Sequence, residues 1–206
     1  MTGLGDQAAM WDARYSEQEG AMWSGRPNGR FVAEVTGLAP GTALDVGCGE
    51  GADAIWLAGR GWTVTAVDVS TVAVDRARQA AERAGVTVAW MAGDVLAQAL
   101  PEGAFDLVSL QYPALPTAAG DAAVARLLAT VRPGGVLLAV YHDLDDHHRE
   151  RMQEHGADPD DFVGVDDLAR LVADGFEVET YEVVPRVDPP PDAHHVADVV
   201  LRARRR

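Results

Sequence analysis

Apolar runs rich in β-branched residues alternate with segments of helical period between residues 42 and 141. This alternation is typical of βαβ units and predicts a mostly parallel sheet. The expected strands are Thr42–Val46, Trp62–Val67, Val86–Met91, Phe105–Leu110 and Val136–Tyr141. The expected helices are Gly51–Arg60, Ser70–Ala84 and Gly120–Val131. We expect Ser70 to cap the second helix, Gly85 to end it and Arg76 to face water. The segment Arg132–Gly135 is expected to end the third helix.

The two ends of the chain extend this α/β pattern. Two short helices are expected at Gln7–Glu19 and Asn28–Leu38, where they could cover one mouth of the sheet. A helix at Val165–Asp174 precedes strands at Phe176–Val184 and His195–Leu201, expected as an antiparallel pair at one sheet edge. We therefore expect one doubly wound domain over residues 1–206, comprising a helical cap (1–40), a core (42–141), an insertion (143–165) and a C-terminal helix and strand pair (166–206).

Composition and charge narrow the class of protein. The 206 residues are 48% apolar and carry a net charge of -15, and every basic residue is an arginine. An acidic surface repels phosphate backbones and anionic lipid, so we expect neither a nucleic-acid nor a membrane partner. With one cysteine, Cys48, and no signal-like N-terminus, the chain is expected in the cytoplasm, as a monomer or homodimer.

The acidic residues are concentrated late in the chain. Residues 141–192 hold sixteen of them against four arginines. We expect Asp143–Asp167 to be mostly a solvated surface insertion, and Asp188–Asp192, with three prolines, to be a stiff connector.

Candidate chemistry lies where strands turn into helices, because ligands of open α/β sheets bind beyond the carboxyl ends of the strands. The first such turn is Leu44–Gly51, in which glycines allow a tight turn and a close ligand. Gly47, Gly49 and Ala52 also satisfy the dinucleotide pattern G-x-G-x-x-G/A, so a nicotinamide cofactor remains an alternative on this motif alone.

Carboxylates around this turn favour a cationic ligand. Asp45, Glu50 and Asp53 lie in or beside it, and the nearest basic residue in the sequence is Arg60. Such a setting is poor for a diphosphate and suits the sulfonium and ammonium groups of S-adenosylmethionine. Alternatively, Glu50 and Asp53 only favour the helix N-terminus, as acids there usually do.

The next two strands also end in acids. Asp68 suits a ribose diol, because a carboxylate can accept both hydroxyl protons. Asp94 could accept from an adenine amino group, with Val69 and Val95 on either side of the ring, or it could be a plain turn residue.

Together these motifs resemble those of class I S-adenosylmethionine-dependent methyltransferases. They are Leu44–Gly51, Val64–Asp68, Gly93–Asp94, Phe105–Val108 and Arg132–Gly135. The resemblance implies a seven-stranded Rossmann-like sheet, with Gly47, Cys48 and Gly49 along the methionine part of the cofactor, Asp68 on the ribose, Asp94 and Val95 at the adenine, and Gln111 under the methionine. Trp11–Tyr15 and Trp23–Asn28 resemble more narrowly the tellurite-resistance and thiopurine-type branch.

The methyl acceptor is harder to predict. A general base is needed only when the acceptor arrives protonated. His142 with Asp143 could act as that base, or His142 could be an ordinary surface residue, and Tyr112 is the other candidate catalytic residue. Some relatives that methylate amino groups or nucleic acid have Asn-Pro-Pro-Tyr where this chain has Gln111–Ala114, which disfavours an amide or nucleobase nitrogen as acceptor.

N-terminal aromatic and basic residues could complete the site. Trp11, Tyr15, Trp23 and Phe31 could form a lid that excludes water, or could only pack a helix on the sheet. Arg14 could bind the cofactor carboxylate and Arg26 an anionic acceptor, or both could be ordinary solvated arginines. The residues expected to contact the acceptor are Trp23, Arg26, Tyr112 and His142.

We expect no metal site and no cysteine chemistry. The adjacent His147 and His148 cannot point to one helical face, and the carboxylates near Cys48 would raise its pKa. The predicted function is methyl transfer to an oxygen, sulfur, nitrogen or metalloid oxyanion of a small molecule. The alternatives are a nicotinamide-dependent oxidoreductase and a cofactor-binding sensor without catalysis.

Overall fold

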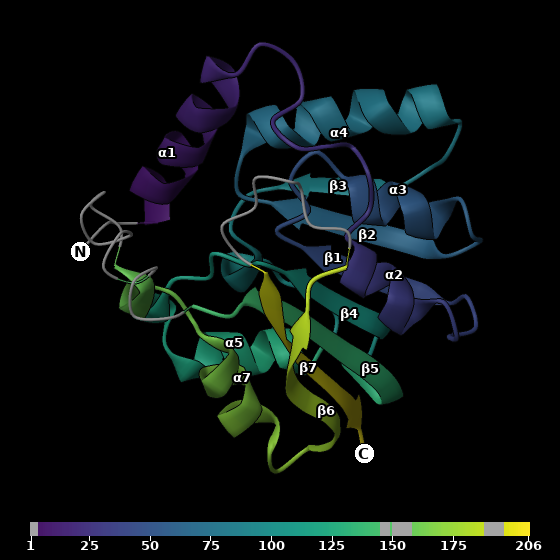
Figure 1. The fold of residues 1–206 in the computed structure, drawn as a ribbon, viewed down its shortest axis with the longest axis vertical. Coiled ribbons are helices and arrows are strands. Elements are labelled where there is room, and N and C mark those ends of the chain that lie inside the picture. Colours follow the sequence, from purple (N-terminus) through teal and green to yellow (C-terminus); the bar gives the residue numbers. More distant parts are fainter. Residues whose placement is uncertain (1–3, 145–148, 150–157, 188–195) are drawn as a thin grey trace.

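The computed structural model describes residues 4–144, 149, 158–187 and 196–206. Within them, seven strands form one sheet in the order β3-β2-β1-β4-β5-β7-β6 (Figure 1). The strands are β1 Thr42–Val46, β2 Thr63–Asp68, β3 Ala89–Ala92, β4 Phe105–Gln111, β5 Val131–His142, β6 Phe176–Pro185 and β7 Ala197–Arg205. The α-helices are α1 Leu4–Glu17, α2 Gly29–Val35, α3 Ala52–Ala58, α4 Thr71–Ala84, α5 Asp121–Leu128 and α7 Val165–Val172, and short 3-10 turns are η1 Val95–Ala97, η2 Thr117–Ala119 and η3 Pro159–Asp161.

The directions of the strands confirm the predicted fold class. Strands β1 to β5 pair in parallel, whereas β7 is antiparallel to both β5 and β6. The predicted C-terminal pair therefore closes one edge of a doubly wound, mostly parallel sheet. The strand order reverses between β1 and β4, which are neighbours in the sheet. Ligands of such sheets bind at this switch point, so the expected ligand position lies beside β1.

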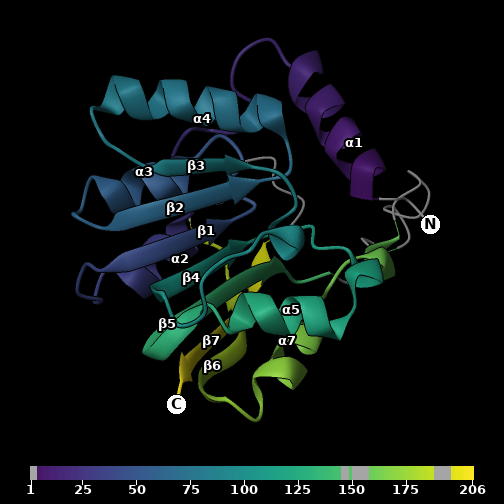
Figure 2. The same cartoon turned by 180° about the vertical axis from the view of Figure 1, so that it is seen from behind.

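Helices cover both faces of the sheet, which explains why the central strands β1 and β4 are almost wholly buried (Figures 1 and 2). Side chains alternate along β1: Leu44 and Val46 pack in the core under α5 and α7, while Ala43 packs with Phe31 and Leu57 of α2 and α3. This alternation also turns Asp45 toward the α2 and α3 face, where it is 2% exposed.

Local signals predicted several helix ends correctly. The Ser70 Oγ accepts a 3.1 Å hydrogen bond from the Ala73 N–H at the start of α4, and Gly85 ends that helix with φ +68°. Asn28 caps α2 by accepting hydrogen bonds from the N–H groups of Arg30 and Phe31.

The Arg132–Gly135 segment does not end a helix, contrary to the prediction. Helix α5 ends at Leu128, and the segment lies inside β5, where the register with β4 shifts between Phe105 and Leu107. Pro133 cannot donate to the ladder and Gly134 adopts φ +79°, so both residues suit an irregular strand as well as a helix end. Strand β3 begins at Ala89 rather than Val86. Strand β7 begins at Ala197, and His195, where it was predicted to begin, lies outside the described residues.

Helix α1 lies against α4, beyond the carboxyl ends of β2 and β3 (Figure 2). Asp12 of α1 accepts hydrogen bonds from the Ser70 hydroxyl at 2.6 Å, the Thr71 hydroxyl at 3.0 Å and the Val72 N–H at 3.2 Å. Partial burial opposes ionisation, but these hydrogen bonds outweigh it and lower the pKa of Asp12. The first helix thereby supplies a second cap to α4.

Candidate functional site

An open cleft of about 2310 Å³ lies at the carboxyl ends of the strands. The turn between β1 and α3 lines one end, and residues 112–118 and 158–167 line the other. Every residue predicted to bind the cofactor or the acceptor lines this cleft, namely Arg14, Trp23, Arg26, Asp45, Gly47, Cys48, Gly49, Asp68, Val69, Asp94, Val95, Gln111, Tyr112 and His142.

The glycine turn presents backbone to the cleft. Gly47 and Gly49 have φ values of +69° and +52°, in the region that side chains disfavour. A Cβ placed on Gly47 would meet no atom within 4 Å, so a ligand has room to approach the backbone there. The Gly49 N–H donates a 2.7 Å hydrogen bond to Asp68 Oδ2, which joins the turn to the end of β2.

Asp68 and Asp94 both hold backbone N–H groups and still face the cleft. Asp68 is 9% exposed, and its Oδ1 accepts from the Ser70 N–H at 2.9 Å. Burial raises the pKa of Asp68, although the hydrogen bonds from Ser70 and Gly49 oppose this. Asp94 caps η1 by accepting from the Leu96 N–H at 2.9 Å, as a turn residue would. Each carboxylate oxygen has two lone pairs, so both side chains keep capacity for ligand donors.

Two buried acceptors at the β1–β4 junction lack a hydrogen-bond partner among the described residues. They are Asp45 Oδ2 and Gln111 Oε1. The Gln111 amide donates to the Ser109 hydroxyl at 3.0 Å, and Ser109 is the register partner of Asp45, so these side chains share one face of the sheet. Burial, reinforced by the charges of Asp53 and Asp68, raises the pKa of Asp45. Unpaired buried acceptors are costly, so both atoms suit a ligand that donates hydrogen bonds.

Glu50 and Asp53 line the cleft and also hold the N-terminal segment in place by hydrogen bonds. The Arg76 Nη1 lies 2.9 Å from Glu50 Oε1, and Glu50 also accepts from the N–H groups of Met22 and Trp23. Asp53 Oδ1 accepts from the Asn28 N–H at 2.7 Å, and burial raises the pKa of Asp53 to about 6.

The prediction that Arg76 faces water is therefore wrong. The first turns of α4 pass beside the glycine turn, so Arg76 reaches Glu50 although 26 residues separate them. The same guanidinium donates to the carbonyl oxygens of Tyr15 and Gln18. Glu50 therefore has Arg76 as a cationic partner, whereas burial raises the pKa of Asp45, Asp53 and Asp68.

Three of the four predicted lid aromatics line the cleft: Trp11, Tyr15 and Trp23. The Trp23 Nε1–H donates to the Tyr15 hydroxyl at 3.0 Å, and Trp23 remains 53% exposed. Phe31 is fully buried against Trp56, because α2 packs on the sheet face, so the lid prediction is wrong for Phe31. Arg14 and Arg26 are exposed, and Arg14 lies over the Trp11 ring.

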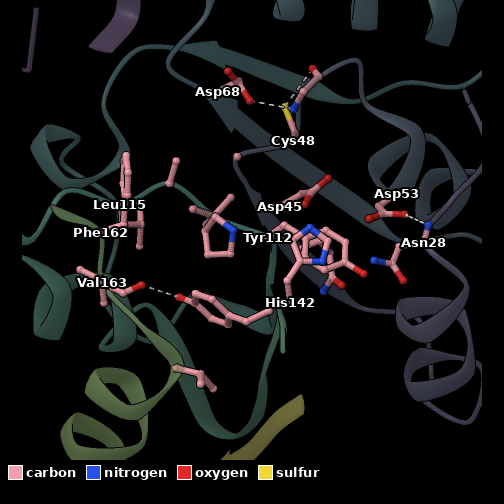
Figure 3. A pocket seen from close by; sticks show the side chains of 18 of the residues that line it. Asn28, Asp45, Cys48, Asp53, Asp68, Tyr112, Leu115, His142, Phe162 and Val163 are labelled. Atoms are coloured by element: carbon pink, nitrogen blue, oxygen red, sulfur yellow. Dashed lines mark hydrogen bonds between the residues drawn. The ribbon is translucent and has the colours of Figure 1, made fainter. Parts of the chain in front are cut away.

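Tyr112 and His142 meet at the floor of the cleft (Figure 3). Their rings stack with centroids 4.0 Å apart and planes 16° apart. The Tyr112 hydroxyl donates to Asp198 Oδ1 at 2.9 Å, and His142 Nδ1 lies 4.0 Å from the same oxygen. The carboxylate beside His142 is thus Asp198 and not the predicted Asp143, which is exposed. A charged residue inside the otherwise apolar run 197–201 was the signal available in the sequence.

Apolar side chains form the end of the cleft away from the glycine turn, among them Leu115, Phe162 and Val163 (Figure 3). Pro116 and Phe162 form a β-bridge, and the Val163 N–H donates to the Leu115 carbonyl at 2.8 Å. Residues 158–165 therefore form a cleft wall rather than part of a solvated insertion. Residues 145–157 of that insertion, apart from Arg149, and the connector 188–192 lie outside the described residues.

The remaining candidate groups are the Cys48 thiol and the metal-ligating side chains. Burial, and then the charges of Asp45 and Asp68, raise the pKa of the Cys48 thiol. The described residues contain no group of three or more metal-ligating side chains, while His147, His148, His194 and His195 lie outside them. No described helix has the length and apolar character needed to cross a membrane.

Comparison with known proteins identifies the core. The family model described as "Methyltransferase domain" matches residues 43–135. Residues 43–135 are therefore similar to a methyltransferase domain. This domain has the fold of class I methyltransferases, and its cofactor is S-adenosylmethionine, so both predictions are confirmed and a nicotinamide cofactor is not.

Relatives of this methyltransferase domain differ in what their names say they act on. Over 106 residues the chain is 34% identical to ribosomal RNA small subunit methyltransferase C of Alcanivorax borkumensis, covering 49% of this chain and 32% of that protein. It is 38% identical over 113 residues to 2-methyl-6-phytyl-1,4-hydroquinone methyltransferase of Synechocystis, covering 53% and 35%. The chain thus spans about a third of the length of these curated relatives.

One solved structure matches over nearly the whole chain. It was determined in work on the conversion of a disulfide bond into a thioacetal group during echinomycin biosynthesis. The two chains are 28% identical, with a TM-score of 0.75, and the match covers 97% of this chain and 92% of that one. The N-terminal helices and the C-terminal strand pair, which the family model leaves out, are included in this match.

Proposed function

We propose that the protein transfers a methyl group from S-adenosylmethionine to an oxygen, sulfur, nitrogen or metalloid oxyanion of a small molecule. One observation carries the proposal: a single cleft joins the polar glycine turn to an apolar wall made by Leu115, Phe162 and Val163. The cofactor supplies an electrophilic methyl carbon on a sulfonium. The chain has to hold the acceptor close to that carbon, and orientation of this kind can account for much of the rate.

The cofactor end has a donor or acceptor for each part of the cofactor. Asp45 Oδ2 and Gln111 Oε1 would accept from the ammonium group, because both are buried and unpartnered among the described residues. Asp68 would accept from the ribose hydroxyls, and Arg14 would bind the carboxylate. The adenine would lie between Val69 and Val95, with its amino group at Asp94, and Gly47, Cys48 and Gly49 would border the methionine part.

The acceptor end favours a small molecule over a nucleic acid. The chain carries a net charge of -15, and Asp158, Asp160 and Asp161 line the rim of the apolar wall. A polyanion would be repelled by this rim, whereas an apolar body would gain from contact with Phe162 and Leu115. Trp23 and Arg26, across the cleft, would contact the acceptor from the N-terminal segment.

The N-terminal motifs suggest which acceptors to test first. Trp11–Tyr15 and Trp23–Asn28 resemble the tellurite-resistance and thiopurine-type branch, so thiols and chalcogen oxyanions lead the panel. Phenols and disulfides follow, the latter because of the sulfur chemistry named for the full-length structural relative.

Transfer of radiolabelled methyl groups tests the proposal directly. The purified chain is incubated with methyl-labelled cofactor and with thiols, phenols, disulfides, tellurite, or total tRNA and ribosomal RNA. We expect label on a small molecule and none on RNA. Label on RNA alone would contradict the proposed acceptor class, and cofactor binding without any transfer would favour the sensor.

A further inference from the structure

The Tyr15 hydroxyl lies close to the glycine turn and has a proton to donate. Tyr15 is 3% exposed and lines the cleft. Its oxygen accepts a 3.0 Å hydrogen bond from the Trp23 Nε1–H, and no atom of the described residues accepts its proton. A Cβ placed on Gly49 would lie 3.0 Å from this oxygen. A buried hydroxyl normally uses its proton in a hydrogen bond, so this group suits a ligand that accepts one.

The environment of Tyr15 keeps this proton in place. Burial raises the pKa of Tyr15 to about 12, and the charges of Asp68 and Glu50 act in the same direction. The hydrogen bond from Trp23 opposes them without cancelling them. At neutral pH the hydroxyl is therefore a donor and not a base.

The glycine turn itself has few donors left for a ligand. The Gly47 N–H donates to the Val67 carbonyl at 2.8 Å, and the Cys48 N–H donates to the same oxygen at 3.1 Å. The Gly49 N–H donates to Asp68. An anionic group that lies along these three residues has to accept hydrogen bonds from side chains instead.

The neighbouring side-chain donors are engaged or exposed. The Arg76 guanidinium donates to Glu50 and to two carbonyl oxygens of the N-terminal segment, and the Trp23 indole donates to Tyr15. Arg14 is exposed, and exposed ion pairs contribute little to binding. In the part of the chain that the structure describes, the Tyr15 hydroxyl is thus the buried side-chain donor beside the turn that still has a proton to give.

We propose that the Tyr15 hydroxyl donates a hydrogen bond to the carboxylate in the methionine part of S-adenosylmethionine, and that Trp23 positions the hydroxyl by donating to its oxygen. This rests on the place proposed above for the methionine part, along Gly47, Cys48 and Gly49. The carboxylate is the anionic group of the cofactor, so it is the part that needs a donor in this acidic site. Tyr15 is then a binding residue for the cofactor as well as a member of the aromatic lid.

The same contact couples the cofactor to the N-terminal segment. The N–H groups of Met22 and Trp23 donate to Glu50, which Arg76 holds. A carboxylate bound to Tyr15 adds one more contact to this segment. By linkage, the cofactor stabilises the docked segment by the same factor by which the docked Tyr15 strengthens cofactor binding. A ligand without the carboxylate has no such effect.

The first test compares two ligands by isothermal titration. S-adenosylhomocysteine has the carboxylate, whereas 5′-deoxy-5′-methylthioadenosine has the same nucleoside and sulfur without the amino-acid part. Tyr15→Phe keeps the ring and removes the hydroxyl. It should weaken binding of S-adenosylhomocysteine about 10-fold or more, because a hydrogen bond to a charged group is lost, and should change the affinity for methylthioadenosine less than about 2-fold. Tyr181→Phe is the matched control at an exposed position beside Asp166, and it should change neither affinity.

The outcomes separate hydrogen bonding from packing. Unchanged affinity of Tyr15→Phe for S-adenosylhomocysteine would overturn the proposal, because a side chain that only packs loses nothing with its hydroxyl. Equal losses for both ligands would overturn it as well, since the hydroxyl would then not act on the carboxylate.

The second test follows amide hydrogen exchange of Met22 and Trp23 by NMR. Saturating S-adenosylhomocysteine should slow exchange of these amides about 10-fold in the wild-type protein and less than about 2-fold in Tyr15→Phe, and methylthioadenosine should slow it less than about 2-fold in both. Equal protection by the two ligands would contradict the coupling. Both tests measure binding without turnover, so a protein that bound S-adenosylhomocysteine as expected but transferred no methyl group would contradict the proposed function and not the role of Tyr15.

Discussion

The two ends of the cleft are built in different ways. At the glycine turn, the residues proposed to bind the cofactor end successive strands, and the key hydrogen bond from Gly49 to Asp68 joins residues 19 apart. At the acceptor end, the hydrogen bond from Tyr112 to Asp198 joins residues 86 apart, and Leu115 pairs with Val163 across the insertion. The cofactor end is thus a product of local βαβ geometry, whereas the acceptor end depends on how distant segments return to the sheet.

This difference suggests how substrate identity is encoded. The parallel strands fix the cofactor end, and relatives that match about half of this chain have names that specify RNA or a hydroquinone. The acceptor end is formed by the loop after β4, by residues 158–165 and by the strand pair β6 and β7. These segments lie outside the β1–β3 units that form the cofactor end. Changes confined to one end should therefore alter one ligand and spare the other.

The largest expected effect is at the cofactor end. Asp68→Ala should weaken S-adenosylmethionine binding by about 10- to 100-fold, because charge-assisted hydrogen bonds contribute about 1.5–3 kcal/mol. Isothermal titration measures this. The control is Asp75→Ala, an exposed acid on the outer face of α4, which should leave the affinity unchanged. An unaltered affinity for Asp68→Ala would refute the ribose assignment.

The next largest effect is expected on stability, from a change that detaches the N-terminal segment. Arg76→Ala removes the partner of Glu50 and the donors to Tyr15 and Gln18, so the free energy of unfolding should fall by about 1–3 kcal/mol. Urea unfolding measures the change. Arg83→Ala, on the exposed side of the same helix, should cost less than about 0.5 kcal/mol. Equal losses from both variants would show that Arg76 does not hold the segment.

A change at the apolar wall should affect only the acceptor. Phe162→Ala should raise the KM of an apolar acceptor about 10-fold, since the lost contact is worth roughly 1–2 kcal/mol. The calorimetric affinity for the cofactor should stay the same. Val178→Ala, at an exposed position of β6, serves as the control. A parallel loss of cofactor affinity would contradict the separation of the two ends.

The smallest expected effect is a pH dependence at the glycine turn. Burial raises the pKa of Asp53 from 3.8 to about 6, so the folded protein binds more protons than the unfolded chain between those values. Stability should therefore fall as pH rises from about 4 to about 6. Asp53→Asn can still accept from the Asn28 N–H but does not titrate, so it should reduce this loss by on the order of 1 kcal/mol. Urea unfolding at pH 4 and pH 7 measures the free energy of unfolding of both proteins. The same change in this free energy between the two pH values for wild type and Asp53→Asn would contradict the prediction.

Short-range signals made much of the fold predictable. The bounds of β1, the Ser70 cap and the Gly85 stop depend on residues only a few positions away, and each was predicted correctly. Arg132–Gly135 was misassigned because proline and glycine interrupt strands as well as helices. The local sequence pattern was sufficient where the bounds of an element depend on residues within that element.

Long-range contacts explain what the sequence did not predict. The reach of Arg76 to Glu50, the position of Asp198 beside His142, and the wall formed by residues 158–165 each require knowledge of which elements become neighbours. Every residue predicted to bind the cofactor or the acceptor lines the cleft, whereas the predicted lid residue Phe31 does not. The spacing along the sequence could not predict that Asp198, and not Asp143, lies beside His142.

Isothermal titration with S-adenosylmethionine, S-adenosylhomocysteine and NAD in parallel tests the central claim most directly. We expect micromolar binding of the first two and none of NAD, because the buried acceptors Asp45 Oδ2 and Gln111 Oε1 suit an ammonium group and no diphosphate. Binding of NAD alone would contradict the assignment of the glycine turn and, with it, the proposed methyl transfer.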